Sequence, residues 1–270
     1  MTAGLQFAGL SDVGRLRTNN QDRWGAHLDE EAERSLFIVA DGVAGSADGA
    51  LAAGLVVELL PTYVSLQLKP ADSDDEADPA APETLGRALT GFCDDFRAYA
   101  DIDPRAAGAN STVVAVLVTG SRALVAHLGD SRAYVCRRQQ LQQLTRDHSL
   151  VQELIDAHQV DIEDAKEHPR RNVITRHVAM YPRALPDTAA VELQPGDRIL
   201  LSSDGLHGVV DETALAQILG SHPDPGDACA ALIDAANDAG GPDNITAVVI
   251  DIAGPDPGTR SVGTAIPGET

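Results

Sequence analysis

Aspartates recur in this sequence at the ends of short apolar runs or beside turns that contain glycine. Apolar runs of this length are typical of buried strands, and a Gly or Asn beside the acid is typical of the turn that bounds a strand. Carboxylates that converge from rigid strand ends repel one another unless a hard divalent cation with oxygen ligands lies between them. Such a site would favour phosphoryl chemistry. The residues concerned are Asp22, Asp41, Asp130, Asp204 and Asp243.

Each of these aspartates also has a purely structural interpretation. Asp-Gly and Asp-Asn are common turn pairs, so for any one of the residues a turn role and a metal role are about equally favoured. Acids recur at strand ends from the N-terminal quarter to the last predicted strand, and this recurrence favours a shared site.

The composition limits the class of protein. A chain of 270 residues with 43% hydrophobic content fits one large domain or two small ones. The three cysteines are scattered without a Cys-x-x-Cys pair, which indicates a reducing compartment and argues against zinc or a disulfide framework. No apolar stretch is expected to cross a bilayer, and the N-terminus lacks the pattern of a secretory signal. We therefore expect a cytoplasmic protein without a membrane anchor.

The charge balance restricts the partners. The formal net charge is −21, which opposes binding to nucleic acid and to anionic membranes. Part of the excess lies in the acidic run 72–78, which is most simply a solvated loop. The carboxylates of the proposed site would contribute another part, which bound cations would offset.

Groups of predicted strands alternate with pairs of predicted helices. The strands are expected within 5–14, 23–28, 35–41, 111–118, 122–129, 131–136, 197–203 and 244–252, and the helices within 47–68, 83–101, 148–168, 211–220 and 226–239. Because short links join the three runs between 111 and 136, we expect an antiparallel meander there. The grouping favours an α+β fold of antiparallel sheets covered by helices over a doubly wound parallel sheet. The tail 253–270 is rich in Pro, Gly, Ser and Thr, and is expected to be disordered.

Eight motifs occur in one order along the chain. They are SDVGRLRTNNQD (11–22), VADGVAGSADG (39–49), NSTVVAVLV (110–118), HLGDSRAYV (127–135), LTRDHS (144–149), HPRRNVITR (168–176), GDRILLSSDGL (196–206) and GGPDNITAVVI (240–250). In this order they resemble the PP2C-type (PPM) metal-dependent serine/threonine protein phosphatases in their compact bacterial form. The resemblance implies a single domain over 1–252, built as a β-sandwich of two antiparallel sheets flanked by helix pairs.

The resemblance also implies roles for individual residues. The ligands of a binuclear metal pair fall on Asp41, the carbonyl of Gly42, Asp204 and Asp243, and Asp130 with Asp204 matches a third metal position. Arg17 matches the arginine that holds the substrate phosphate, and Asp22 matches an acid that positions metal-bound water. Residues 148–170 match a mobile flap beside the site. The implied reaction is hydrolysis of phosphoserine and phosphothreonine by direct attack of a metal-bridging hydroxide.

An all-oxygen ligand set selects Mn²⁺ or Mg²⁺ over Zn²⁺, as two or three ions. The expected partners are phosphorylated proteins, either substrates of a serine/threonine kinase or that kinase itself, and the protein is expected to be a monomer. The alternative is a non-catalytic phosphoprotein-binding module of the same fold. Such modules usually lose a metal ligand, and here the four aspartates matched to metal positions are present, which favours an enzyme.

Two further features keep two interpretations each. His207 is either a substitute general acid or, as we favour, a surface residue at the start of a short helix. The flap arginines Arg170, Arg171 and Arg176 either recognise phosphoprotein or, as we favour, pair with acidic residues of the preceding helix.

Overall fold

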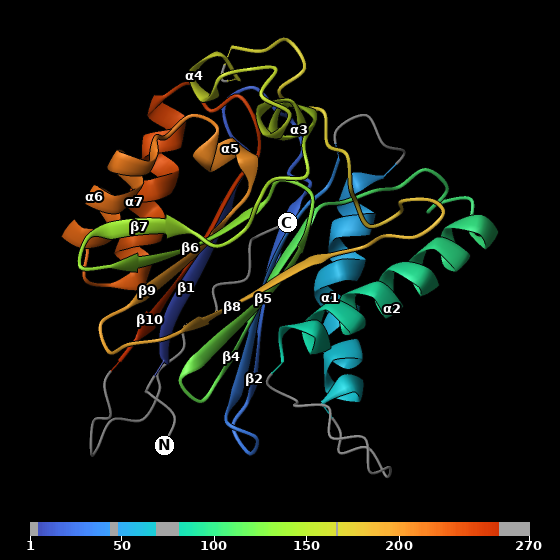
Figure 1. Cartoon of the computed structure of the whole chain (residues 1–270), viewed down its shortest axis with the longest axis horizontal. Helices are drawn as coiled ribbons and strands as arrows, with labels where there is room; N and C mark the ends of the chain where they lie inside the picture. Colours follow the sequence, from blue (N-terminus) through green and yellow to red (C-terminus); the bar gives the residue numbers. More distant parts are fainter. Residues whose placement is uncertain (1–4, 44–47, 69–80, 166, 254–270) are drawn as a thin grey trace.

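The computed structural model describes residues 5–43, 48–68, 81–165 and 167–253, and its framework is two antiparallel five-stranded sheets (Figure 1). The first sheet contains, in spatial order, β1 (Leu5–Asp12), β10 (Ile245–Ile252), β9 (Arg198–Ser202), β6 (Arg132–Arg137) and β7 (Gln140–Gln143). The second contains β2 (Asp22–Asp29), β3 (Arg34–Asp41), β4 (Val113–Thr119), β5 (Arg122–Leu128) and β8 (Asp187–Glu192). The sheets pack face to face as a sandwich.

A pair of helices covers the outer face of each sheet (Figure 1). Helices α1 (Gly49–Gln67) and α2 (Pro82–Ile102) pack on the second sheet, and α6 (Glu212–Ser221) and α7 (Pro225–Asp238) pack on the first. The short helices α3 (Leu150–Asp156), α4 (Ile162–Ala165) and α5 (Asp204–His207) lie at one end of the sandwich. The predicted α+β sandwich flanked by helix pairs is confirmed.

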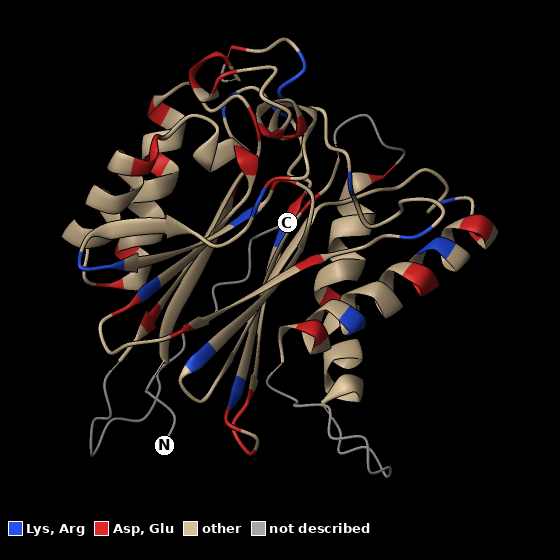
Figure 2. Ribbon diagram, in the orientation of Figure 1, with Lys and Arg blue, Asp and Glu red and all other residues tan. Residues whose placement is uncertain are grey.

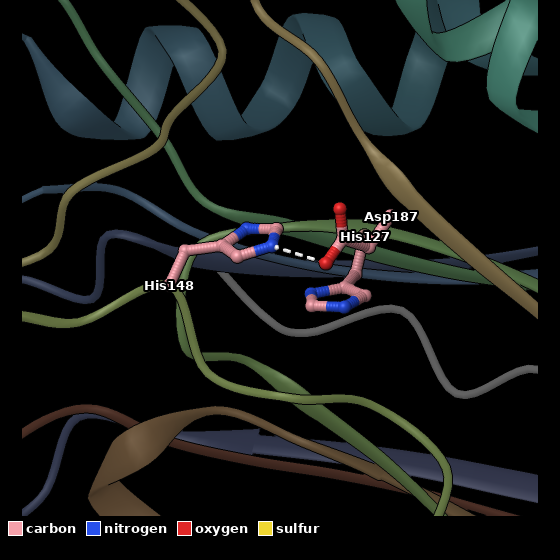
Figure 3. A group of neighbouring side chains, drawn as sticks. All are labelled: His127, His148 and Asp187. Carbon is pink, nitrogen blue, oxygen red and sulfur yellow. Dashed lines mark ion pairs between the residues drawn. The ribbon is translucent and has the colours of Figure 1, made fainter. Parts of the chain in front are cut away.

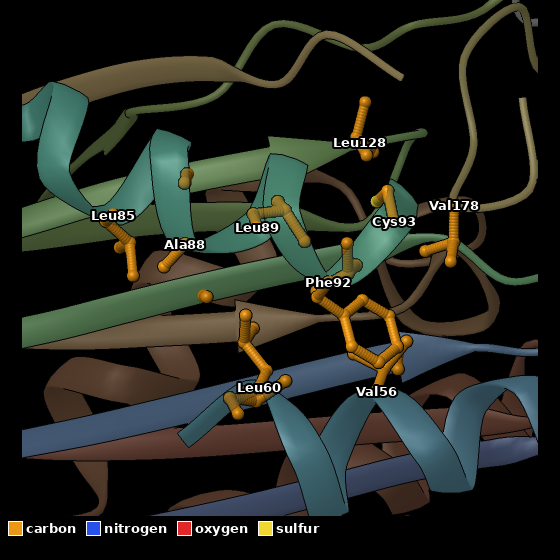
Figure 4. Packing of buried hydrophobic residues seen from close by; sticks show 14 of the residues in the cluster. Val56, Leu60, Leu85, Ala88, Leu89, Phe92, Cys93, Leu128 and Val178 are labelled. Atoms are coloured by element: carbon orange, nitrogen blue, oxygen red, sulfur yellow. The ribbon is translucent and has the colours of Figure 1, made fainter. Parts of the chain in front are cut away.

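Three apolar clusters account for the long apolar runs of the sequence. One fills the space between the sheets, and the other two lie between each sheet and its helices. Figure 4 shows the cluster under α1 and α2, where Phe92, Leu60 and Leu89 meet the second sheet. Strand β4 is buried from Val113 to Val118 because one face meets helices and the other meets the opposite sheet. This packing makes the strand ends rigid supports for the acids that follow them.

The predicted meander is wrong at its third strand. Strands β4 and β5 pair as expected, but β6 pairs with β7 and β9 in the other sheet. The chain changes sheets at Gly129, whose φ of +100° favours glycine. Strands β7 and β8 were not predicted, because both are short and only partly buried and so carry a weak apolar signal.

Helix α1 corrects the expectation that no apolar stretch approaches the length needed to cross a bilayer. By length and composition alone this helix could cross one, with a mean hydropathy of 1.6. In the fold one face of the helix is buried against β2, β3 and α2, through Ala52, Val56 and Leu60. Two further predictions concern the acidic run 72–78 and the tail beyond residue 253, and both segments lie outside the described residues.

Candidate metal centre

The five strand-end aspartates lie together at the end of the sandwich that carries α3 and α5. Asp22 begins β2 and lies opposite Asp41, the last residue of β3. Asp130 follows β5, Asp204 follows β9 and opens α5, and Asp243 precedes β10. Residues of both sheets therefore contribute. Asp22 and Asp130 are buried and the other three are partly exposed, so the group remains reachable for ions from solvent.

The carboxylates perturb one another strongly. Burial, and then the charges of Asp22, Asp204 and Asp130, raise the pKa of Asp41 well above its usual value. Burial and Asp204 do the same to the pKa of Asp130, and burial with Asp243 raises the pKa of Asp204 to about 6. These shifts have one physical cause, which is that anionic groups share a site with little solvent. A multivalent cation between them would remove that penalty.

Two carboxylate oxygens in this group have no hydrogen-bond partner among the described residues. The hydroxyls of Ser203 and Thr246 each donate to Oδ2 of Asp22 at 2.7 Å, whereas the buried Oδ1 of Asp22 is left without a donor. Oδ1 of Asp204 is likewise buried without a hydrogen-bond donor. Buried polar atoms are normally satisfied, so these oxygens point to an absent ligand. An oxygen-only set of this kind fits Mn²⁺ or Mg²⁺.

Gly42 lies where a side chain would not fit. A Cβ at this position would lie 2.4 Å from the carbonyl carbon of Gly49, at the start of α1. The Gly42 amide donates to the Gln21 carbonyl at 3.2 Å, and Gly42 pairs with Ser111 in an isolated antiparallel bridge. The Val43 amide donates to the Asn110 carbonyl at 3.0 Å, so the backbone on both sides of Gly42 is fixed, as a carbonyl ligand requires.

Arg17 reaches the same site from the loop between β1 and β2. Its Nη2 atom lies 2.8 Å from Oδ2 of Asp243, in a pair whose side chains are 39% and 31% exposed. The sequence-predicted phosphate-binding arginine is thus adjacent to a predicted metal ligand. Its guanidinium carries further donors, and the exposure leaves them accessible to an anion arriving from solvent.

Hydroxyl and amide residues that the sequence prediction missed hold the acids in place. Asn244 donates to the carbonyls of Val13 and Asn19 at 2.9 and 3.0 Å, and it accepts from the Gln21 amide at 2.8 Å. The Thr112 hydroxyl accepts from the Asp41 amide at 3.2 Å. Other members of the set are Ser111, Ser131, Ser203 and Thr246. The sequence did carry a signal for these residues, because each of them lies within three positions of a strand-end aspartate or contacts one.

The remaining predictions on single residues have mixed outcomes. Nδ1 of His207 lies 2.9 Å from the Ser202 hydroxyl, and burial lowers the pKa of His207 well below its usual value. The favoured surface interpretation of His207 is therefore wrong, since the ring is partly buried and held. Arg176 pairs with Asp187 on β8 at 2.7 Å rather than with the preceding helix. Arg170 and Arg171 are exposed.

Comparisons with known proteins relate this chain to one protein family. The sequence model described as protein phosphatase 2C matches residues 15–230. The chain is 34% identical over 247 residues to protein phosphatase PhpP of Streptococcus pneumoniae, covering 91% of this chain and 97% of that protein.

Solved structures of phosphatases share the fold. The serine/threonine phosphatase PstP/Ppp of Mycobacterium tuberculosis has a TM-score of 0.78 at 32% identity, over 93% of this chain and 99% of that one. The catalytic domain of a serine threonine protein phosphatase PstP, in complex with two manganese ions, has a TM-score of 0.72 at 29% identity, over 93% of this chain and 99% of that one.

Proposed function

The chain belongs to the protein phosphatase 2C family and is a metal-dependent protein serine/threonine phosphatase, and we propose that its strand-end aspartates form the catalytic metal centre. In this assignment Asp41, the Gly42 carbonyl, Asp204 and Asp243 hold two cations, and Asp130 with Asp204 holds a third. The observation that carries the proposal is the convergence of these carboxylates at one end of the sandwich, where the pKa values of Asp41, Asp130 and Asp204 are raised and a buried oxygen of Asp204 lacks a hydrogen-bond partner. A binding module would have no need of so costly a cluster.

Divalent cations, Mn²⁺ or Mg²⁺, supply the chemistry that the side chains lack, because they activate water for attack on phosphorus and neutralise phosphate charge. The side chains of this protein do the positioning. Arg17 is placed to grip two phosphate oxygens in a fork that lysine cannot copy. Asp22 has Oδ2 occupied by Ser203 and Thr246, which leaves Oδ1 as the acceptor that can orient the attacking water.

We further propose where and on what the enzyme acts. Phosphoproteins are the substrate class, with a serine/threonine kinase as the opposing enzyme or itself a substrate. Acidic segments occur in both helical layers and near the site end of the molecule (Figure 2), and the net charge of −21 disfavours nucleic acid and anionic membranes as partners. The three cysteines are buried and unpaired, in agreement with a cytoplasmic location. A monomer with one catalytic domain over 1–252 is the simplest assembly.

Phosphopeptide assays test the residue assignment. The metal-depleted protein should be inactive on phosphoserine and phosphothreonine peptides in EDTA and regain turnover with Mn²⁺ or Mg²⁺, whereas Asp41→Asn and Asp243→Asn should not recover. Asp224→Asn is the matched control, because Asp224 caps α7 by accepting from the Gly226 amide at 2.7 Å and Asn caps equally well. Normal turnover by a folded Asp41→Asn protein would reject the assignment.

A further inference from the structure

A second group of titratable side chains lies next to the Asp130 turn. His127 on β5, His148 just before α3 and Asp187 at the start of β8 come together there (Figure 3). The two imidazole rings stack with centroids 4.5 Å apart and planes 12° apart. Both histidines are buried, with 3% and 5% of their surface exposed. Nothing in the proposed reaction uses this group, so its role needs its own explanation.

His148 holds both polar backbone groups of Gly129, the residue before Asp130. The Gly129 amide donates to Nδ1 of His148 at 3.2 Å, and the His148 amide donates to the Gly129 carbonyl at 3.0 Å. Gly129 is also the residue at which the chain changes sheets. The direction in which Asp130 leaves β5 is therefore fixed by a residue of the flap, 148–170.

The opposite edge of the His148 ring faces the start of β8, beyond the flap. Nε2 of His148 lies 3.2 Å from Oδ2 of Asp187, close enough for electrostatic attraction between a ring N–H and the carboxylate although off the line of a hydrogen bond. Asp187 also pairs with Arg176 at 2.7 Å. The Thr175 amide donates to the His148 carbonyl at 2.8 Å, so the start of the flap is tied to the segment that follows the flap. We call His148, Asp187 and Arg176 the flap clamp.

The group has the residue types of a metal site, and its possible ligand atoms lie within 4.8 Å of one another. The hydrogen bonds of His148 argue against that role. A neutral imidazole has one donor and one acceptor nitrogen, and Nδ1 already accepts from Gly129. The ring proton therefore lies on Nε2, which leaves no lone pair there for a metal. Burial lowers the pKa of His148, and burial together with His148 lowers the pKa of His127 to about 4, so both rings are neutral.

We propose that His148 is a positioning residue through which the flap clamp sets the Asp130 turn, and with it the affinity of the cation position shared by Asp130 and Asp204. The inference rests on the proposed function, which assigns that position. The physical path is short. Asp187, which pairs with Arg176, lies against Nε2 of His148. The His148 ring accepts from the Gly129 amide, and Gly129 sets the direction of Asp130. A flap displaced from the clamp would release the turn and weaken this one cation position, while Asp41, Asp204 and Asp243 stay in place.

Two substitutions of His148 separate its two contacts. In His148→Asn the amide oxygen replaces Nδ1 and can still accept from Gly129, but the side chain no longer reaches Asp187. In His148→Gln the amide reaches as far as Nε2 did, but the acceptor beside Gly129 is lost. His168→Asn is the matched control, because His168 is a partly exposed flap residue whose Nδ1 likewise accepts a backbone amide, from Arg170 at 3.2 Å.

Calorimetric titration with Mn²⁺ in the absence of substrate gives the first readout. The binding step missing from Asp130→Ala identifies the position in question. His148→Gln should weaken that step by about 10–100-fold, the usual effect of losing a group that orients a metal ligand, and leave the tighter steps unchanged. His148→Asn keeps the Gly129 contact but loses Asp187, so it should weaken the same step by less than His148→Gln does, and His168→Asn should bind as wild type does. Unchanged Mn²⁺ binding in a folded His148→Gln protein would overturn the proposal.

Hydrogen exchange gives the second readout and does not depend on activity or metal. Asp187→Asn should accelerate exchange of the Thr175 and His148 amides by roughly tenfold or more, as expected when a segment opens locally, whereas exchange in β4 should not change. Equal exchange in Asp187→Asn and wild type, or stoichiometric Zn²⁺ binding that is lost in His127→Ala, would overturn the clamp. If the protein fails to hydrolyse phosphopeptides yet shows these binding and exchange patterns, the proposed function fails and the clamp stands.

Discussion

The carboxylates at the site repel one another, and the fold holds them close together despite this repulsion. The raised pKa values of Asp41, Asp130 and Asp204 mean that their ionised forms are less stable in the folded protein than in water. Other aspartates of the same sequence have a different role, since Asp48 and Asp211 cap α1 and α6 by accepting from backbone amides at 2.8 Å. The sequence pattern around an acid does not separate these roles, whereas the partners of its oxygens do.

Asp204→Asn should stabilise the metal-free protein and abolish metal-dependent turnover. The substitution removes one charge from the repelling group and keeps the turn, since Asn suits the same backbone. A gain of about 1 kcal/mol would raise Tm by roughly 2–4 °C for a domain of this size, measured by thermal unfolding in EDTA. Asp211→Asn is the control and should not shift Tm, because Asn and Asp cap helices equally well. A lower Tm for Asp204→Asn in EDTA would contradict the repulsion argument.

Arg17→Ala should mainly raise KM, at a cost of about 1.5–3 kcal/mol in kcat/KM, the usual range for a charged hydrogen bond. Arg17→Lys should recover only part of this loss. Because Arg17 pairs with Asp243 at 2.8 Å, its removal should leave Mn²⁺ affinity unchanged or tighten it by at most about fivefold, the worth of an exposed ion pair. Arg15→Ala removes the same charge two residues away and serves as the control in steady-state kinetics. Intact kcat/KM for Arg17→Ala on every phosphopeptide would place the phosphate elsewhere.

Turns rather than strands decide how closely the acids approach. At Gly14, with φ of +78°, a Cβ would lie 2.1 Å from the Asp243 carbonyl oxygen, and at Gly205 it would lie 2.0 Å from that of Asn244. The loop after β1 and the turn into α5 are thus pressed against the turn before β10. Only glycine permits this approach, so these positions are structural requirements of the site.

Gly14→Ala should separate the loop that carries Arg17 from the Asp243 turn. We expect a loss of roughly 1–3 kcal/mol in the free energy of unfolding from strain and overpacking, with a larger fall in kcat/KM than stability alone explains. Gly120→Ala is matched in its positive φ of +55° but has no atom within 4 Å of the added Cβ. It should lose stability through backbone strain and keep its kcat/KM. Equal kinetic effects of the two substitutions, measured at a temperature where both proteins are folded, would argue against the close approach.

At the scale of elements, periodicity predicted most strands and helices, and motif order predicted the sandwich. The strand pairing was harder, because the sheet change at Gly129 depends on a single positive φ that many glycines do not adopt. The positions of the five aspartates followed from rigid strand ends, so their convergence was predictable. The flap clamp was not, because its members His148, Arg176 and Asp187 are separated in the sequence and form no recognisable spacing pattern. The roles of the aspartates as ligands stay a prediction until variants are measured.

At the scale of the whole molecule, the site lies across the boundary between the two sheets. Asp41 belongs to the second sheet, whereas Asp204 and Asp243 adjoin strands of the first. Trp24, the only tryptophan, reports on the same boundary, because the ring of this β2 residue would lie 2.6 Å from a Cβ added to Gly9 on β1. A cation held by both sheets opposes their separation, so metal binding and global stability should be linked.

Mn²⁺ should therefore raise the unfolding temperature of the whole domain in one cooperative step. A ligand at 100 times its Kd adds about 2.7 kcal/mol to the free energy of unfolding, which corresponds to roughly 5–10 °C in Tm at this chain length. Trp24 fluorescence and far-ultraviolet circular dichroism should shift together, because the sheet boundary and the secondary structure unfold in the same transition. Asp41→Asn removes the carboxylate that the second sheet contributes to the proposed metal pair and should lose most of the shift, whereas Asp224→Asn should keep it. A shift seen by only one probe, or retained in full by Asp41→Asn, would mean that the cations bind one sheet alone and that the site does not span the sandwich.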